Sequence, residues 1–120
     1  MGAMVRTILV IDDHAGFRGE ARRLLEKGPF TVVGEAADAA TGLLAAKQLQ
    51  PDVVLLDVVL PDSDGFAVLE ALLDVPVPPA VVLVSTRDAS DYGDRVARSG
   101  ATGFIQKARL SVHAMDALLT

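Results

Sequence analysis

The chain has 120 residues, of which 51% are hydrophobic, and these values fit one compact domain with a single core. Because 16 acidic side chains outnumber 11 basic ones, we do not expect the domain to bind nucleic acid directly. The lack of cysteine excludes a disulfide scaffold, a thiolate zinc site and a cysteine nucleophile. No apolar run approaches the roughly 18 residues of a membrane span and no leader precedes the first strand-like run, so we expect a cytoplasmic protein without membrane contact.

Short apolar runs alternate with stretches of helical periodicity. The runs are rich in branched residues, have the length of buried strands, and occupy residues 7–11, 31–34, 53–56, 80–84 and 103–105. Apolar stripes predict helices near residues 17–25, 39–44, 66–73, 92–96 and 112–119, the last with Ser111 as its N-cap. The stripe of Tyr92 and Val96 is the weakest of the five.

Five strands alternating with five helices predict a doubly wound α/β domain. Right-handed crossovers place helices on both faces of a mostly parallel sheet, and each strand should then be buried on both sides. Ligands of such folds collect beyond the carboxyl ends of the strands. We therefore expect the functional residues directly after the apolar runs.

Polar residues follow four of the five runs: Asp12, Asp13 and His14 the first, Asp57 the third, Ser85 the fourth and Lys107 the fifth. Two carboxylates about 4 Å apart repel by roughly 4 kcal/mol at an effective dielectric near 20, so a cluster of three needs a cation. Oxygen ligands without cysteine or paired histidines favour Mg²⁺ over zinc. An aspartate that faces a metal and a lysine can act as a nucleophile and accept a phosphoryl group as an acyl phosphate.

Each strand-end residue also has a purely structural interpretation. The alternatives are a helix N-cap for Asp12 and Asp13, a turn cap for Asp57, a loop hydroxyl for Ser85, a solvated helix residue for His14 and a surface charge for Lys107. The agreement of four strand ends favours the phosphoryl site. Asp62 and Asp64 have the surroundings of a turn before a helix, and we expect no catalytic role for them.

Four stretches carry these residues in a fixed order: ILVIDDHAGFR at residues 8–18, PDVVLLDVVLPDSDGF at 51–66, VLVSTRD at 82–88 and GATGFIQK at 100–107. The second contains the pattern D-x-x-x-P-x-x-x-G, which begins at Asp57. Together they closely resemble the response-regulator receiver domain of two-component signalling. The resemblance implies one receiver domain over residues 1–120, with a flavodoxin-like sheet in the order 2-1-3-4-5.

The resemblance also implies a role for each strand-end residue. Asp57 would be the phosphoacceptor, and Lys107 would pair with the phosphoryl oxygens. Asp12, Asp13 and the backbone carbonyl of Val59 would be ligands of Mg²⁺. Ser85 would donate a hydrogen bond to the phosphoryl group, and Phe104 would be the switch aromatic. A new dianion would pull the hydroxyl inward and vacate space for the ring. A local charge would thereby change the protein surface.

Three positions depart from the commonest pattern of the receiver domain. Thr86 stands where a small residue is frequent, so its side chain could narrow access to the phosphoryl group. Phe104 stands where tyrosine is also common and lacks its hydroxyl. Ala108 follows Lys107 where proline is often found, so we expect no proline-dependent cis peptide there.

The opening DDHAGFRGEARRLL resembles the branch of response regulators with a carboxyl-terminal helix-turn-helix DNA-binding domain. No such domain is present in these 120 residues, so a stand-alone receiver and a part of a longer transcription regulator are both open, and we favour the second interpretation. We interpret residues 1–4 as a cloning remnant or a disordered start. The expected partners are a sensor histidine kinase, a second copy in a homodimer, and the missing effector domain.

Two rival functions stay open. A phosphohydrolase with an aspartyl nucleophile would use the same magnesium and lysine, but such enzymes resemble D-x-D at the nucleophile, and Val59 stands at the second position after Asp57. We therefore expect no enzyme activity beyond catalysis of the domain's own phosphorylation and dephosphorylation. The second rival is a receiver-like interaction module that acts without phosphorylation, against which the complete acidic set and Lys107 argue.

Overall fold

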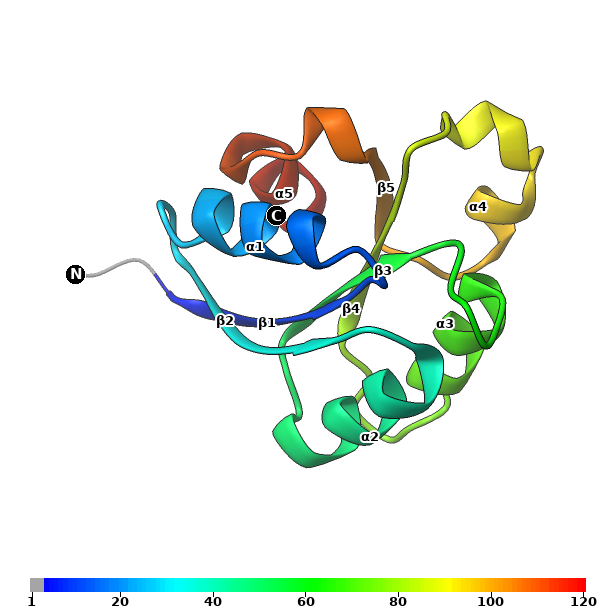
Figure 1. The fold of residues 1–120 in the computed structure, drawn as a ribbon, viewed down its shortest axis with the longest axis horizontal. Coiled ribbons are helices and arrows are strands. Elements are labelled where there is room, and N and C mark those ends of the chain that lie inside the picture. Colours follow the sequence, from blue (N-terminus) through cyan, green and yellow to red (C-terminus); the bar gives the residue numbers. More distant parts are fainter. Residues whose placement is uncertain (1–3) are drawn as a thin grey trace.

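The computed structural model describes residues 4–120 and shows a five-stranded parallel sheet with helices on both faces (Figure 1). The strands are β1 (Arg6–Ile11), β2 (Phe30–Ala36), β3 (Val53–Asp57), β4 (Ala80–Ser85) and β5 (Gly103–Gln106), in the order β2-β1-β3-β4-β5. The helices are α1 (Ala15–Leu25), α2 (Ala39–Leu49), α3 (Gly65–Leu73), α4 (Arg95–Arg98) and α5 (Val112–Leu119), with 3-10 turns η1 (Ala89–Tyr92) and η2 (Lys107–Arg109). The predicted fold and strand order are confirmed.

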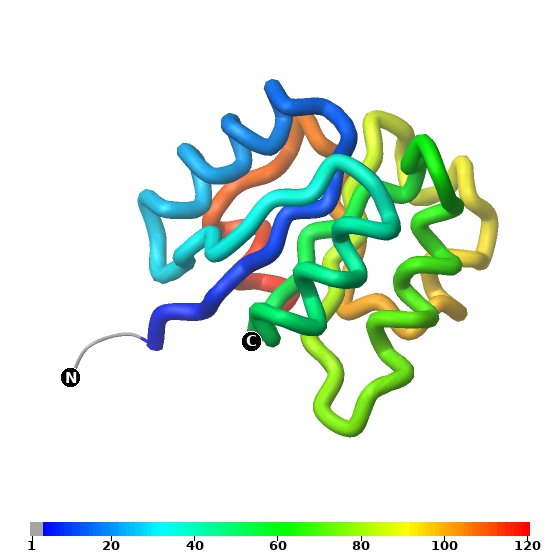
Figure 2. Tube along the Cα trace, turned by 60° about the horizontal axis from the view of Figure 1, so that its bottom comes forward, coloured from blue at the N-terminus to red at the C-terminus, as the bar shows by residue number. Residues whose placement is uncertain are grey.

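Alternate residues of the central strands enter two separate cores. In β1, Ile8 and Val10 pack toward α1 and α5, whereas Leu9 and Ile11 pack toward α2 and α3. Figures 1 and 2 show α1 and α5 on one face of the sheet and α2 and α3 on the other. None of the helices within residues 4–120 is long and apolar enough to cross a membrane.

The strands β3 and β4 run one residue further than their apolar runs. Asp57 and Ser85 are the last residues of these strands, and the strand pairing holds them beside their neighbours in the sheet. Asp12 lies one residue beyond β1, where its N–H donates to the carbonyl of Ala36. Regular sheet geometry thus fixes the backbone of all three residues.

The expectation that every strand is buried on both faces is wrong for β2. This strand lies at the edge of the sheet and exposes alternate residues, among them Thr31, Val33 and Glu35. Phe30 and Val32 of this strand enter one core and Ala36 enters the other, but an edge strand has a neighbouring strand on one side only, so the residues between them are open to solvent.

The predicted fourth helix is not continuous. Tyr92 ends the 3-10 turn η1, Gly93 has a left-handed φ of 61°, and the single turn of α4 follows from Arg95. Neither η1 nor α4 contains a buried residue. The apolar stripe of this segment was too weak to stabilise a longer helix, because packing of an apolar face provides most of a helix's stability in proteins.

A glycine brings the start of α3 against the strand end that carries Asp57. A Cβ on Gly65 would lie 2.5 Å from the carbonyl oxygen of Asp57 and 2.6 Å from the Cα of Val58. Both are backbone atoms, which cannot turn aside as a flexible side chain can. Gly65 is the last residue of the D-x-x-x-P-x-x-x-G pattern, and this close approach is a physical reason for a glycine there.

We therefore expect Gly65→Ala to lower the free energy of unfolding by about 2 kcal/mol or more, because overpacking forces the backbone to move. Gly19→Ala is the matched control, since a Cβ at this exposed position of α1 meets nothing within 4 Å. This second change should stabilise the domain by roughly 0.5–1 kcal/mol through helix propensity. Urea unfolding of both variants measures the difference, and equal effects would contradict the close-approach argument.

Candidate functional site

Three polar side chains are buried at the carboxyl edge of the sheet. Asp12, Asp57 and Ser85 have exposed fractions of 0%, 4% and 2%, and they are the buried polar residues among those the structure describes. They come from the ends of β1, β3 and β4, which are neighbours in the sheet. The strand order therefore brings together residues that the sequence separates widely.

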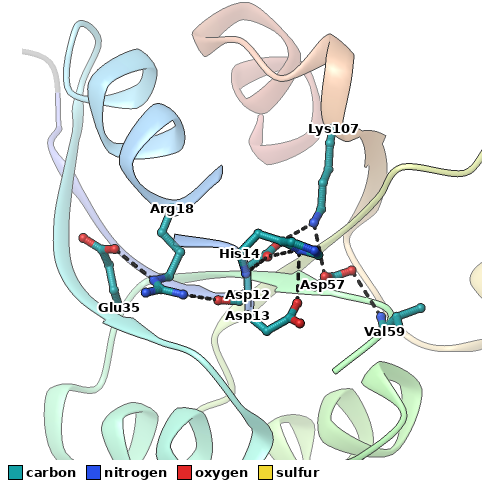
Figure 3. Close-up of polar contacts among 8 residues, drawn as sticks. All are labelled: Asp12, Asp13, His14, Arg18, Glu35, Asp57, Val59 and Lys107. Carbon is teal, nitrogen blue, oxygen red and sulfur yellow. Dashed lines mark hydrogen bonds and ion pairs between the residues drawn. The ribbon is translucent and has the colours of Figure 1, made fainter. Parts of the chain in front are cut away.

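Lys107 reaches both buried carboxylates (Figure 3). Its Nζ lies 2.6 Å from Oδ2 of Asp12 and 3.2 Å from Oδ2 of Asp57, and its side chain is 10% exposed. The ammonium also lies 4.7 Å from the ring centre of Phe17, a cation–π distance. The surface-charge interpretation of Lys107 is therefore wrong, because the side chain is enclosed by an aromatic ring and two carboxylates.

Asp12, Asp13, His14 and Asp57 form one group whose potential ligand atoms all lie within 4.8 Å of one another. The His14 Nδ1 is 3.2 Å from Asp12 Oδ1 and 3.1 Å from Asp13 Oδ1. His14 is the N-cap residue of α1 rather than a residue within it, and its side chain is 66% exposed. The N-cap interpretation of the two aspartates is wrong, since neither side chain caps α1.

The two carboxyl oxygens of Asp57 have different partners. Its Oδ1 accepts a hydrogen bond of 3.1 Å from the Val59 N–H, which is the turn cap that the structural alternative predicts. Its Oδ2 faces Lys107. The two roles are compatible, because the Val59 N–H orients the carboxyl whose other oxygen faces the site. The side chain of Val59 itself is 62% exposed.

The ionisation of this group reflects burial and mutual repulsion. Burial, followed by the nearby charge of Asp12, raises the pKa of Asp57 despite the opposing Val59 N–H and Lys107. Burial disfavours the charged form of Lys107, yet the two carboxylates outweigh it and raise the pKa of this lysine. Lys107 is thus a permanent cation at neutral pH, and Asp57 ionises at a cost to the folded state.

Two further residues support the site, and the sequence analysis missed both. Arg18 donates from Nη1 to the backbone carbonyl of Asp12 at 2.6 Å and from Nε to Glu35 at 3.2 Å. Figure 3 shows this arginine between Glu35 of β2 and the Asp12 loop. Phe17 is the second. Both lie one turn after the aspartates on α1, a spacing that could have indicated them.

The Ser85 hydroxyl is turned toward a residue with no predicted role. It lies 2.7 Å from the Tyr92 hydroxyl and accepts a 3.0 Å bond from the Arg87 N–H. Tyr92 in turn packs between two rings, at centroid distances of 5.9 Å to Phe66 and 6.1 Å to Phe104. The half-buried Phe104 therefore belongs to an aromatic row, Phe66–Tyr92–Phe104, on the α3 face of the sheet.

Asp62 and Asp64, which lie between Pro61 and Gly65, have structural roles at the starts of two helices. Asp62 accepts bonds from the N–H groups of Ala39 and Ala40 at the start of α2, and these bonds lower the pKa of its carboxyl. Asp64 caps α3 through the Phe66 N–H and forms an ion pair of 2.8 Å with Arg95. Neither joins the group around Asp57.

The three positions that depart from the commonest receiver pattern, Thr86, Phe104 and Ala108, lie in or directly after β4 and β5. Thr86 is exposed, and its carbonyl accepts a bond from the Gln106 side chain. Ala108 lies in η2, directly after β5, and the residues described contain no cis peptide. The effect of Thr86 on access to Asp57 stays a prediction.

The fold and this site define a flavodoxin-like α/β domain with an acidic pocket at its strand ends. The profile of the response regulator receiver domain matches residues 8–118, and the chain belongs to this family. Its structure resembles that of the signal receiver domain of the response regulator NarL from Mycobacterium tuberculosis, with a TM-score of 0.86, 34% identity and 98% of each chain covered. The protein is thus a receiver domain of the two-component response regulators.

The curated relatives that match this chain differ in their described activity. The chain is 36% identical over 104 residues to the transcription regulator BvgA of Bordetella pertussis, covering 87% of this chain and 50% of that protein. It is 40% identical over 107 residues to a protein-glutamate methylesterase/protein-glutamine glutaminase of Symbiobacterium thermophilum, covering 88% of this chain and 30% of that protein. The chain spans about half the length of the first curated relatives it matches.

The raised pKa of Asp57 predicts a stabilising effect of Asp57→Asn. Between the ordinary and the raised pKa the folded protein holds a proton that the unfolded chain has lost, so stability falls as pH rises through this window. Without metal, Asp57→Asn should therefore melt a few degrees above the parent protein at pH 7, and the difference should vanish near pH 3.

Thermal unfolding from pH 3 to 8 in a chelator tests this expectation. Asp74→Asn, at the exposed end of α3, is the control for the loss of one surface carboxylate and should change the melting temperature at pH 7 less than Asp57→Asn does. A lower melting temperature of Asp57→Asn at pH 7 would show that the Lys107 pairing outweighs the cost of burying the carboxylate.

Proposed function

We propose that this receiver domain accepts a phosphoryl group on Asp57 from a histidine kinase and uses the added charge to change an output surface. The single observation behind the proposal is the buried Asp57 carboxylate beside Lys107, with a hydroxyl from β4 at the same edge of the sheet. An Oδ atom of Asp57 attacks phosphorus and forms a P–O bond, and the P–N bond to the kinase histidine breaks. Its electron pair stays on the imidazole nitrogen, which takes up a proton from water.

The charges around Asp57 suit this reaction. Lys107 pairs with the carboxylate before transfer and can pair with the phosphoryl oxygens afterwards, because a charge-assisted bond to an ammonium is stronger than a neutral one. The enclosed position of its Nζ above Phe17 limits competition from water. Lys107 thus lowers the cost of adding negative charge at a buried strand end.

The residues present also fit a bound Mg²⁺. Three carboxylates against the one ammonium of Lys107 leave an excess of two negative charges, which a divalent cation balances. We propose Asp12, Asp13, Asp57 and the Val59 carbonyl as the protein ligands. Bound there, the cation would neutralise charge on the transferred phosphoryl group.

The remaining parts of the proposal concern partners. A sensor histidine kinase is the donor, the protein works in the cytoplasm, and the output is a homodimer contact or release of an attached DNA-binding domain. The length of the curated relatives and the transcription regulators among them support this output. The phosphorylation and dephosphorylation of Asp57 are the only reactions that we propose for the domain.

Intact-mass analysis tests the phosphoacceptor. With Mg²⁺ and a phosphorylated histidine kinase, the protein should gain one phosphoryl group, and Asp57→Asn should gain none. The control Asp74→Asn should be labelled like the parent. Full labelling of Asp57→Asn would refute the assignment. Acetyl phosphate as the donor would add a test of whether Thr86 restricts access for small phosphodonors.

Thermal shift measurements test the metal. Because a ligand of the folded state stabilises it by mass action, Mg²⁺ at 100 times its dissociation constant should add about 2.7 kcal/mol to the free energy of unfolding. Asp13→Asn removes a charged ligand from the cluster. This variant should therefore need at least a tenfold higher Mg²⁺ concentration to reach the same increase in stability. The side chain of Asp13 is 37% exposed, so the variant should fold.

The exposed Glu70→Gln on α3 is the matched control and should respond to Mg²⁺ like the parent. NaCl at equal ionic strength separates binding from general screening. An unchanged Mg²⁺ response in Asp13→Asn would remove this aspartate from the proposed ligand set.

A further inference from the structure

Tyr92 is hydrogen-bonded to the hydroxyl of Ser85, the residue that would bind the phosphoryl group in the proposed switch. Its phenol oxygen lies 2.7 Å from the Oγ of Ser85, and no hydrogen bond connects Ser85 to Asp57 within residues 4–120. Ser85 is 2% exposed, so water cannot readily replace a lost partner. Tyr92 comes from η1, a segment that lies outside the sheet and outside the group of carboxylates.

The bonds of Ser85 leave little freedom. A serine hydroxyl has one proton to donate and two lone pairs that accept. In this structure the Oγ accepts from the Arg87 N–H and shares one bond with Tyr92. A phosphoryl group at neutral pH offers acceptor oxygens, so Ser85 must turn its proton toward them to bind it. The Ser85–Tyr92 bond in which Ser85 donates its proton is lost when that proton turns to a phosphoryl oxygen.

The segment beyond Tyr92 depends on few contacts. Neither η1 nor α4 buries a residue, and the ties of this segment to the α3 side are the Tyr92 ring, the Arg95–Asp64 ion pair of 2.8 Å and the Arg95 guanidinium 4.2 Å above the Phe66 ring. Figures 1 and 2 both show α4 beside α3, at the end of the sheet near β5. Loss of one of these ties would therefore alter the position of a whole surface segment.

We propose that Tyr92 is a positioning residue of the switch: its hydroxyl retains Ser85 in the resting orientation and is released when Ser85 binds the phosphoryl group. The inference rests on the proposed function at Asp57. It adds a second aromatic to Phe104 and gives the switch a polar contact, which Phe104 cannot supply because it has no hydroxyl. Release of Tyr92 frees η1 and α4, and these become the segment that reports phosphorylation.

The protein itself provides a probe of this bond. Tyr92 is its single tyrosine and it has no tryptophan, so its intrinsic fluorescence comes from one phenol. In the unligated protein, Ser85→Ala should change the tyrosine emission, because the phenol loses its buried partner. Beryllofluoride, which binds carboxylates with the tetrahedral shape of a phosphoryl group, should change the emission of the parent in the same direction. Unchanged emission in both cases would overturn the proposal.

Calorimetric titration with beryllofluoride and Mg²⁺ shows whether Tyr92→Phe raises or lowers the affinity for beryllofluoride. Because Tyr92→Phe keeps the ring and removes only the competing bond, it should bind beryllofluoride about fivefold more tightly than the parent, a factor typical of one net hydrogen bond. In a Ser85→Ala background the same change should have no effect. Ser90→Ala, which removes an exposed hydroxyl from the same turn, is the matched control and should bind like the parent.

The outcomes separate this inference from the proposed function. Parent protein that binds no beryllofluoride and gains no phosphoryl group would overturn the function of Asp57, and the switching role of Tyr92 with it. Normal binding by the parent with weaker or unchanged binding by Tyr92→Phe would overturn the role of Tyr92 alone. An equal effect of Tyr92→Phe with and without Ser85 would also overturn it, since a merely structural residue acts independently of Ser85.

Discussion

One ammonium group between two buried carboxylates is the interaction on which this site depends. Lys107 lies within ion-pair distance of Asp12 and Asp57, which have exposed fractions of 0% and 4%. Buried carboxylates without a partner are costly, and Lys107, the first residue of η2 directly after β5, provides one cation for both aspartates. The lysine is 50 residues from Asp57 along the chain, so the pairing exists only once β1, β3 and β5 share one sheet.

The same pairing leaves the site incompletely balanced. Asp13 and the second charge of the Asp12–Asp57 pair exceed what one lysine neutralises. Burial, followed by the nearby charge of Asp12, raises the pKa of Asp57. A site with surplus negative charge from carboxylates is suited to a divalent metal. Strand pairing fixes the backbone of Asp57 and Ser85, so these two residues keep their places in the sheet.

The segment of η1 and α4 is held less firmly than the other helices. Residues such as Leu25 of α1, Leu69 of α3 and Met115 of α5 are completely buried. In contrast, η1 and α4 bury no residue and are held by the aromatic row and by Arg95. A small change at Ser85 therefore has its largest mechanical effect on the lightly held segment, since packed cores resist gradual deformation.

The sequence determined the periodicity and the order of the strand-end residues, and from these the fold, the strand order and the group of Asp12, Asp13, Asp57 and Lys107 were predictable. Apolar periodicity is a local property, and parallel strands bring their carboxyl ends to one edge. Only the tertiary structure decided that β2 is half exposed, that Gly93 interrupts the fourth helix, and that Tyr92 and Arg18 bind Ser85 and the Asp12 carbonyl. These features depend on which side chains face one another after the elements have packed, and no local pattern along the chain records that.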